Sequence, residues 1–151
     1  MTTEQPRSPQ QRKRDTLARF DQDLDAWVAS ADRDGNAHLV PLSFLWDGTT
    51  FTLATDGSTP TGRNLRSSGR ARLAIGLTRD VVLVDGTVET HTLDTVPTRL
   101  ADAFAAKQAW DPRGGGPRYV FFLVTPRRIQ AWREVDEIAG RDLMRDGRWL
   151  V

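Results

Sequence analysis

The chain has 151 residues, which is the length of one ordinary domain and too short for two independently folded ones. With 38% hydrophobic and 27% charged residues it has a globular composition, and no apolar run approaches the about 18–20 residues of a membrane-spanning helix. The formal net charge of +1 provides no global attraction to nucleic acid, and the absence of cysteine excludes disulfides, thiolate metal sites and thiol redox pairs. Any redox chemistry must therefore come from a bound cofactor.

The amino-terminal segment and the first helix are distinguished by their apolar pattern. Residues 1–14 are polar and contain no apolar segment, so they are predicted to form a flexible tail rather than a secretory signal, and the protein is expected in the cytoplasm. Apolar residues spaced three and four apart then predict a short amphipathic helix over 14–24.

Most of the remaining chain carries the apolar pattern of β-strands, with turn residues between the runs. The predicted strands cover residues 26–30, 37–46, 50–55, 71–77, 81–92, 119–124 and 128–133, followed by a terminal hairpin joining 142–144 to 148–150. Asp85-Gly86 lies inside one run and favours a bulge over a tight hairpin, because a bulge bends a strand as barrel closure requires. Pro126 is predicted to separate the strands on either side of it.

Two further helices are predicted between these strands. Thr59 supplies a capping hydroxyl and Pro60 suits a first helical turn, so residues 61–68 read as a short connecting helix. Residues 93–110 carry one apolar face and begin near Asp94, which can cap them. The pattern predicts one mainly β domain over 15–151, an antiparallel barrel of six to seven strands with two or three short helices.

Several common catalytic sites lack the residues that they need. The only histidines, His38 and His91, are not accompanied by ligand spacing, so no metal site is expected. No Gly-x-Ser-x-Gly turn and no glycine-rich phosphate loop of either nucleotide-binding type occurs, and the glycines 114–116 are interpreted as a flexible loop. No catalytic residue is assigned from the sequence.

The segment 58–66 combines hydroxyls, free N–H groups at a helix start and arginines within about one turn. This combination can hold a phosphate, and an ordinary capped surface helix with solvated arginines explains it equally well. Arg63, Arg66, Arg70 and Arg72 also form a basic cluster that could touch nucleic acid, but the chain lacks the interleaved aromatic residues and strong positive charge of that class.

Pro41 lies inside the strand-like run 38–46, where its missing N–H requires an edge, a bulge or an interruption. A local interruption would leave backbone polar groups available to a flat heterocycle, whereas an edge-strand proline is the commoner explanation.

The order of these motifs resembles the pyridoxamine 5′-phosphate oxidase-like split β-barrel family, from about Leu24 to the carboxyl terminus. The resemblance rests on His38-Leu39-Val40-Pro41-Leu42, Phe44-x-Trp46-Asp47-Gly48, the strand ending at Thr55, the helix with Arg63-Asn64-Leu65, and Ile129-Gln130-Ala131-Trp132-Arg133. Within the family it most resembles the actinobacterial branch that uses the deazaflavin coenzyme F420 in place of FMN.

The resemblance implies a homodimer with two cofactors at the subunit interface. It places the ring against the strand around residues 40–43, the phosphate at the second helix, and Trp132 near the cofactor of the other subunit. The cofactor-binding residues that it implies are His38, Val40, Pro41, Leu42, Ser43, Thr55, Thr61, Arg63, Asn64 and Trp132. Related sequences often have a lysine where this chain has Thr61, so Arg63 is left to provide the positive charge.

The function implied is an oxidoreductase that transfers a hydride between bound F420, which is favoured, or FMN and a small conjugated organic substrate. A non-catalytic carrier or sensor that binds flavin, F420 or haem is the alternative. A nucleic-acid-binding barrel is the weakest of the three hypotheses, and neither nucleic acid nor a membrane is expected as a partner.

Overall fold

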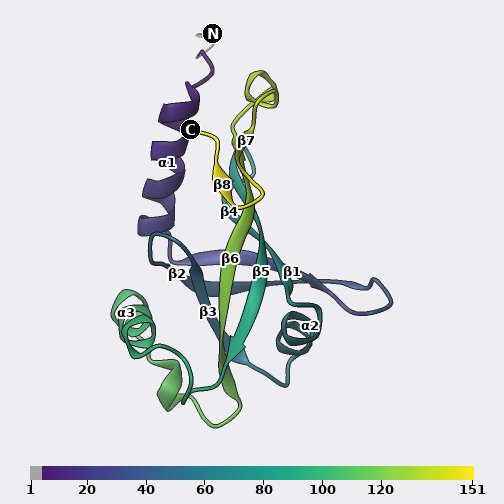
Figure 1. Cartoon of the computed structure of the whole chain (residues 1–151), viewed down its shortest axis with the longest axis vertical. Helices are drawn as coiled ribbons and strands as arrows, with labels where there is room; N and C mark the ends of the chain where they lie inside the picture. The colour runs from purple at the N-terminus through teal and green to yellow at the C-terminus, as the bar shows by residue number, and fades with distance from the viewer. Residues whose placement is uncertain (1–4) are drawn as a thin grey trace.

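The computed structural model describes residues 5–151 and shows a β-barrel with helices packed at its two ends (Figure 1). Along the chain the elements are α1 (Pro9–Gln22), β1 (Asp25–Ala31), β2 (Ala37–Trp46), β3 (Phe51–Asp56), α2 (Pro60–Ser68), β4 (Arg70–Leu77), β5 (Asp80–His91), α3 (Thr98–Gln108), the 3₁₀ turn η1 (Pro112–Gly114), β6 (Tyr119–Trp132), the 3₁₀ turn η2 (Val135–Glu137), β7 (Asp142–Arg145) and β8 (Arg148–Trp149).

The strands form one antiparallel sheet in the order β3-β2-β1-β4-β5-β6-β7-β8. An additional pairing of β3 with β6 closes the first six strands into a barrel, and β7 and β8 extend the sheet beyond it. The predicted mainly β, antiparallel barrel with short helices is therefore confirmed.

Large apolar side chains fill the barrel, and α1 contributes one of them. Phe20 of α1 is fully buried, and its ring centroid lies 4.8 Å from that of Phe51 and 5.1 Å from that of Trp46. Aromatic pairs at these separations add to the stabilisation that burial provides. A second, smaller cluster that includes Phe104 and Phe121 lies under α3. The burial of Phe20 fixes α1 against the barrel.

The predicted bulge is present between Asp85 and Gly86, where the register between β5 and β6 shifts. A Cβ on Gly86 would lie 2.5 Å from Cγ1 of Val124, so only glycine fits at this bend. The predicted break at Pro126 is wrong, because β6 runs unbroken from Tyr119 to Trp132. Pro126 pairs with Gly86 at the register shift, where the regular ladder of hydrogen bonds is already disrupted.

Two predicted boundaries also differ from the structure. The helix α1 begins at Pro9, with Ser8 accepting a hydrogen bond from the N–H of Gln11, so residues 9–14 do not belong to a flexible tail. Residues 1–4 of that predicted tail lie outside the described residues. The helix α3 begins at Thr98 rather than in the predicted stretch from residue 93, and no side chain caps it.

Within residues 5–151, no helix is both long enough and apolar enough to cross a membrane.

Candidate functional site

The strand β2 parts from β3 halfway along its length, which leaves a free edge on the barrel. β1 pairs with β2 over residues 37–43, whereas β3 pairs with it only over 44–46. Among the described residues, the stretch 37–43 therefore has a paired strand on one side only, and its backbone polar groups on the other side can hydrogen-bond a ligand. Pro41 lies in this stretch opposite Trp27, which confirms the edge explanation for that proline.

The loop before α2 is a tight turn held by its own side chains. Asp56 accepts hydrogen bonds from the N–H of Ser58 at 2.8 Å and from its hydroxyl at 2.6 Å. The Thr59 hydroxyl accepts from the N–H of Gly62 at 3.1 Å, as its predicted capping role requires. A Cβ on Gly62 would lie 2.7 Å from the Asp56 carbonyl oxygen, so the helix start and the loop approach as closely as two backbones can.

Three exposed arginines surround this loop. Arg63 donates a hydrogen bond from Nη1 to the Ser58 carbonyl at 2.6 Å, and the guanidinium of Arg66 packs against Gly57. Arg118 approaches from the segment before β6, with its Nε 3.6 Å from the Asp56 carboxylate. Three positive charges against one carboxylate leave a net positive site, and guanidinium groups suit the bidentate binding of phosphate.

Arg118 was not predicted from the sequence. It follows a glycine-rich loop that carries no motif, and only the tertiary structure places it beside α2. The N–H of Gly57 donates to the Arg118 carbonyl at 2.8 Å, which ties the two loops together.

The structure separates the residues that the family resemblance places at the phosphate. Asn64 donates to the Ser30 hydroxyl at 3.2 Å, and Ser30 pairs with His38, so α2 is joined to the free edge of β2 through β1. Thr61 is only 2% exposed, and its hydroxyl has no hydrogen-bond partner among the described residues. A surface ligand would meet Arg63 before Thr61, so the charge at this site comes from the arginine.

The remaining predicted residues lie at different distances from this site. Thr55 lies next to the site, because it directly precedes Asp56 and pairs with Val120 of β6. Residues 40–43 alternate between the two faces of β2, so one ring face can contact either Val40 and Leu42 or Pro41 and Ser43, but not all four side chains. A ring lying along the free edge would contact the backbone of all of them.

Trp132 lies at the opposite end of β6 from this site. About 40 Å of strand separates it from Tyr119, which pairs with Asp56. Its ring lies 5.7 Å from the guanidinium carbon of Arg141. Within one chain Trp132 therefore takes no part in the site, and a contact with a cofactor requires a second subunit.

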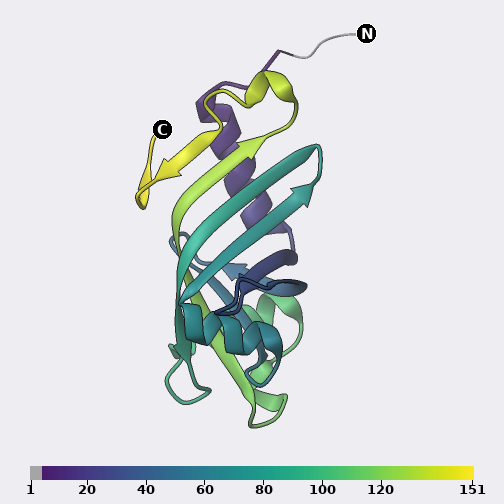
Figure 2. The same ribbon diagram turned by 90° about the vertical axis from the view of Figure 1, so that its right-hand side faces the viewer.

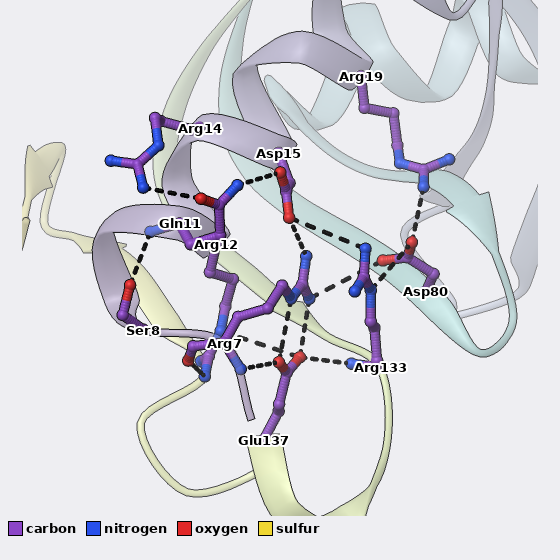
Figure 3. Close-up of polar contacts among 10 residues, drawn as sticks. All are labelled: Arg7, Ser8, Gln11, Arg12, Arg14, Asp15, Arg19, Asp80, Arg133 and Glu137. Carbon is purple, nitrogen blue, oxygen red and sulfur yellow. Dashed lines mark hydrogen bonds and ion pairs between the residues drawn. The ribbon is translucent and has the colours of Figure 1, made fainter. Parts of the chain in front are cut away.

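A second cluster of charged groups lies at the end of the barrel that carries α1 (Figure 3). The carboxylate of Glu137, which is 2% exposed, accepts hydrogen bonds from Arg7 Nη2 at 2.7 Å and from the N–H groups of Arg7 and Arg133 at 2.9 Å. Arg7 also donates to Asp15 at 3.2 Å, and Arg19 donates to Asp80 at 3.0 Å. Because positive and negative groups satisfy one another, this cluster stabilises the fold rather than forming a ligand site.

The Arg7–Glu137 contact predicts a pH dependence of stability. Hydrogen bonds from Arg7 lower the pKa of Glu137 from 4.5 to about 2, against the opposing effect of burial. A carboxylate with a lowered folded-state pKa contributes its full stability above its unfolded pKa and loses it as the pH falls through the folded one. In urea unfolding between pH 4.5 and 2, the wild type should therefore lose more stability than Glu137→Gln. Parallel pH profiles would contradict this assignment.

A known protein family matches the part of the chain that forms the barrel. The family model described as pyridoxamine 5′-phosphate oxidase matches residues 16–133. The chain belongs to this family. No curated protein matches the sequence significantly. The match extends from α1 to the segment just after β6 and so includes both the free edge of β2 and the α2 loop.

Several solved structures have the same barrel fold. A putative pyridoxamine 5′-phosphate oxidase from Listeria innocua is 18% identical with a TM-score of 0.66, covering 81% of this chain and 98% of that one. An F420 reductase is 17% identical with a TM-score of 0.62, covering 74% and 93%. General stress protein 26 from Bacillus anthracis is 18% identical with a TM-score of 0.61, covering 80% and 93%. At these identities, the likeness establishes the shared fold.

Proposed function

We propose that this pyridoxamine 5′-phosphate oxidase family member binds F420, or else FMN, and acts in the cytoplasm as an oxidoreductase on a small conjugated organic substrate. The observation that carries the proposal is the free edge of β2 joined, through Ser30 and Asn64, to a helix start surrounded by three arginines. The F420 reductase among the structural neighbours favours F420, as does the resemblance to the actinobacterial branch.

The chain's own residues would bind and orient the cofactor. Arg63, Arg66 and Arg118 would hold its phosphate, which needs the positive charge that they concentrate at the α2 loop. The backbone of residues 37–43 would hydrogen-bond the polar edge of the ring. When bound, F420 or FMN supplies the hydride chemistry, while the protein fixes the exposed ring face and excludes water.

An exposed apolar patch supports the proposed homodimer. Leu24, Trp27 and Leu77 are 51%, 51% and 70% exposed and line one groove of about 630 Å³ together with Pro41. Contiguous exposed apolar residues mark interaction surfaces. A second copy of the chain covering this patch would lie against the β2 strand and could bring its own Trp132 to the cofactor. Native mass spectrometry with each cofactor should show two chains and two cofactors.

Replacing Arg63 with alanine should weaken cofactor binding by about 1.5–3 kcal/mol, the value of a charge-assisted hydrogen bond to phosphate. Fluorescence titration with F420 and with FMN measures the dissociation constants. Arg14→Ala, which removes an exposed arginine of α1, is the matched control and should leave both constants unchanged. An unchanged constant for Arg63→Ala would move the phosphate to Arg66 or Arg118, and absence of affinity for both cofactors would refute the proposal.

A carrier or sensor is the second candidate function. The free edge and the arginines supply binding groups, and no described residue at this site is assigned as a proton donor. Reduced cofactor incubated with a panel of enones and quinones separates the two functions. An enzyme would oxidise it with turnover, whereas a carrier would bind it without catalysis.

A further inference from the structure

A second open groove lies at the other end of α2, where β1 parts from β4. The two strands pair only between residues 27–29 and 72–74, and beyond this the β1–β2 hairpin projects away from the barrel (Figures 1 and 2). The groove has a volume of about 810 Å³ and includes Ser68, in the last turn of α2. About 12 Å of helix separates Ser68 from Pro60 at the start of α2, and the Arg66 guanidinium lies against Gly57 at that start, although Arg66 itself is in the last turn.

The apolar part of the groove is formed by residues with small side chains or none. Ala29 and Ala31 of β1 line one side, and Ala71 of β4 and Gly86 of β5 line the other. Ala71 and Gly86 pair with each other and turn their side-chain faces to the barrel interior, since Ala71 belongs to the buried core and a Cβ on Gly86 would meet Val124. The groove thus opens where β1 and β4 diverge, and its exposed apolar surface comes from Ala29 and Ala31.

The rim of the groove is positively charged. Arg72 donates from Nε to Asp85 at 2.5 Å, so this pair is neutral. Arg70 and Arg127 also line the groove, and neither has a carboxylate within salt-bridge distance among the described residues. The carboxylate of Asp32 is already bonded to the N–H groups of the hairpin turn. Arg70 and Arg127 therefore bring two guanidinium groups without an ion-pair partner to this rim, against the single carboxylate of Asp32, and the Arg127 guanidinium also lies close to Gly147 of the β7–β8 turn.

We propose that this groove binds a small organic anion, a carboxylate or phosphate ester on a flat apolar body. Its volume lies within the range of about 300–1,000 Å³ that small-molecule sites occupy. The apolar body would lie on Ala29 and Ala31 of β1, and the anionic group would bind Arg70 and Arg127. The proposal is independent of the cofactor site and does not require F420 or FMN to bind.

Phenyl phosphate and benzoate are suitable probes, with neutral benzyl alcohol as the uncharged comparison. The ¹⁵N-labelled full chain is titrated with each probe and followed by NMR. The amide chemical shifts of residues 29–32, 70–72 and 85–87 should change saturably with the two anions and not with benzyl alcohol. The double variant Arg70→Gln/Arg127→Gln should weaken binding at least about tenfold through loss of charge-assisted bonds. Arg14→Gln is the control, because it also replaces an arginine with glutamine but lies on α1. This variant should bind the two anions as the wild type does.

Asp85→Asn should strengthen anion binding, whereas the double arginine variant should weaken it. It removes a carboxylate from the groove and frees Arg72, so it should tighten binding of both anions about threefold or more. If the Arg72–Asp85 pair only held the groove in shape, its loss would weaken binding instead. Thermal unfolding of each variant shows whether that variant is folded. Weaker binding by folded Asp85→Asn, shifts confined to the α2 start, or equal binding of benzyl alcohol would each overturn the proposal.

Discussion

Replacing Glu137 with alanine is expected to lower the free energy of unfolding by about 3 kcal/mol, the lower end of the range for breaking a buried ion pair. The change removes the carboxylate that accepts three hydrogen bonds from Arg7, whose side chain is only 9% exposed. The loss stays near the lower end because Asp15 remains 3.2 Å from the Arg7 guanidinium. Arg7 would keep its charge in a buried place with most of its partners gone.

Glu134→Ala is the matched control for this experiment. Glu134 pairs with Arg79 at 3.0 Å, but the two side chains are 58% and 79% exposed. Exposed pairs contribute about 0–1 kcal/mol, because water and salt screen them. Urea unfolding of both variants at neutral pH should separate the two losses clearly. Equal losses would show that burial of Glu137 does not strengthen its contribution.

Replacing Gly62 with alanine is expected to cost about 1–3 kcal/mol of stability, because the added methyl overpacks two backbone segments. The new Cβ would lie 2.7 Å from the Asp56 carbonyl oxygen and 2.8 Å from the Cα of Gly57. The loop must move, and with it the Gly57 backbone that anchors Arg118. Under the proposed function, affinity for F420 or FMN should fall as well.

Gly114→Ala provides the comparison for Gly62. A Cβ on Gly114 would meet nothing within 4 Å, so that variant should stay within about 0.5 kcal/mol of the wild type. Chemical unfolding and cofactor titration of the two variants test both parts of the prediction. If Gly62→Ala behaves as Gly114→Ala does, the loop is not held as tightly as its contacts indicate.

Local pattern was sufficient to predict most of the barrel. Alternating apolar residues identified the strands, Thr59 identified the start of α2, and Asp85-Gly86 identified the bulge, because each depends on neighbours in the sequence. The free edge at Pro41 followed from the missing N–H of proline, although an edge and an interruption could not be distinguished.

Contacts between distant segments decided the rest. Arg7 belongs to the fold because Glu137 lies opposite it, and Pro126 continues a strand because Gly86 is its partner. Arg118 joins the arginines of α2 through a backbone hydrogen bond between two loops. The sequence by itself determined which residues form strands and turns, since those preferences are local. Only the tertiary structure decided which charges meet, because an ion pair depends on partners that no sequence spacing specifies.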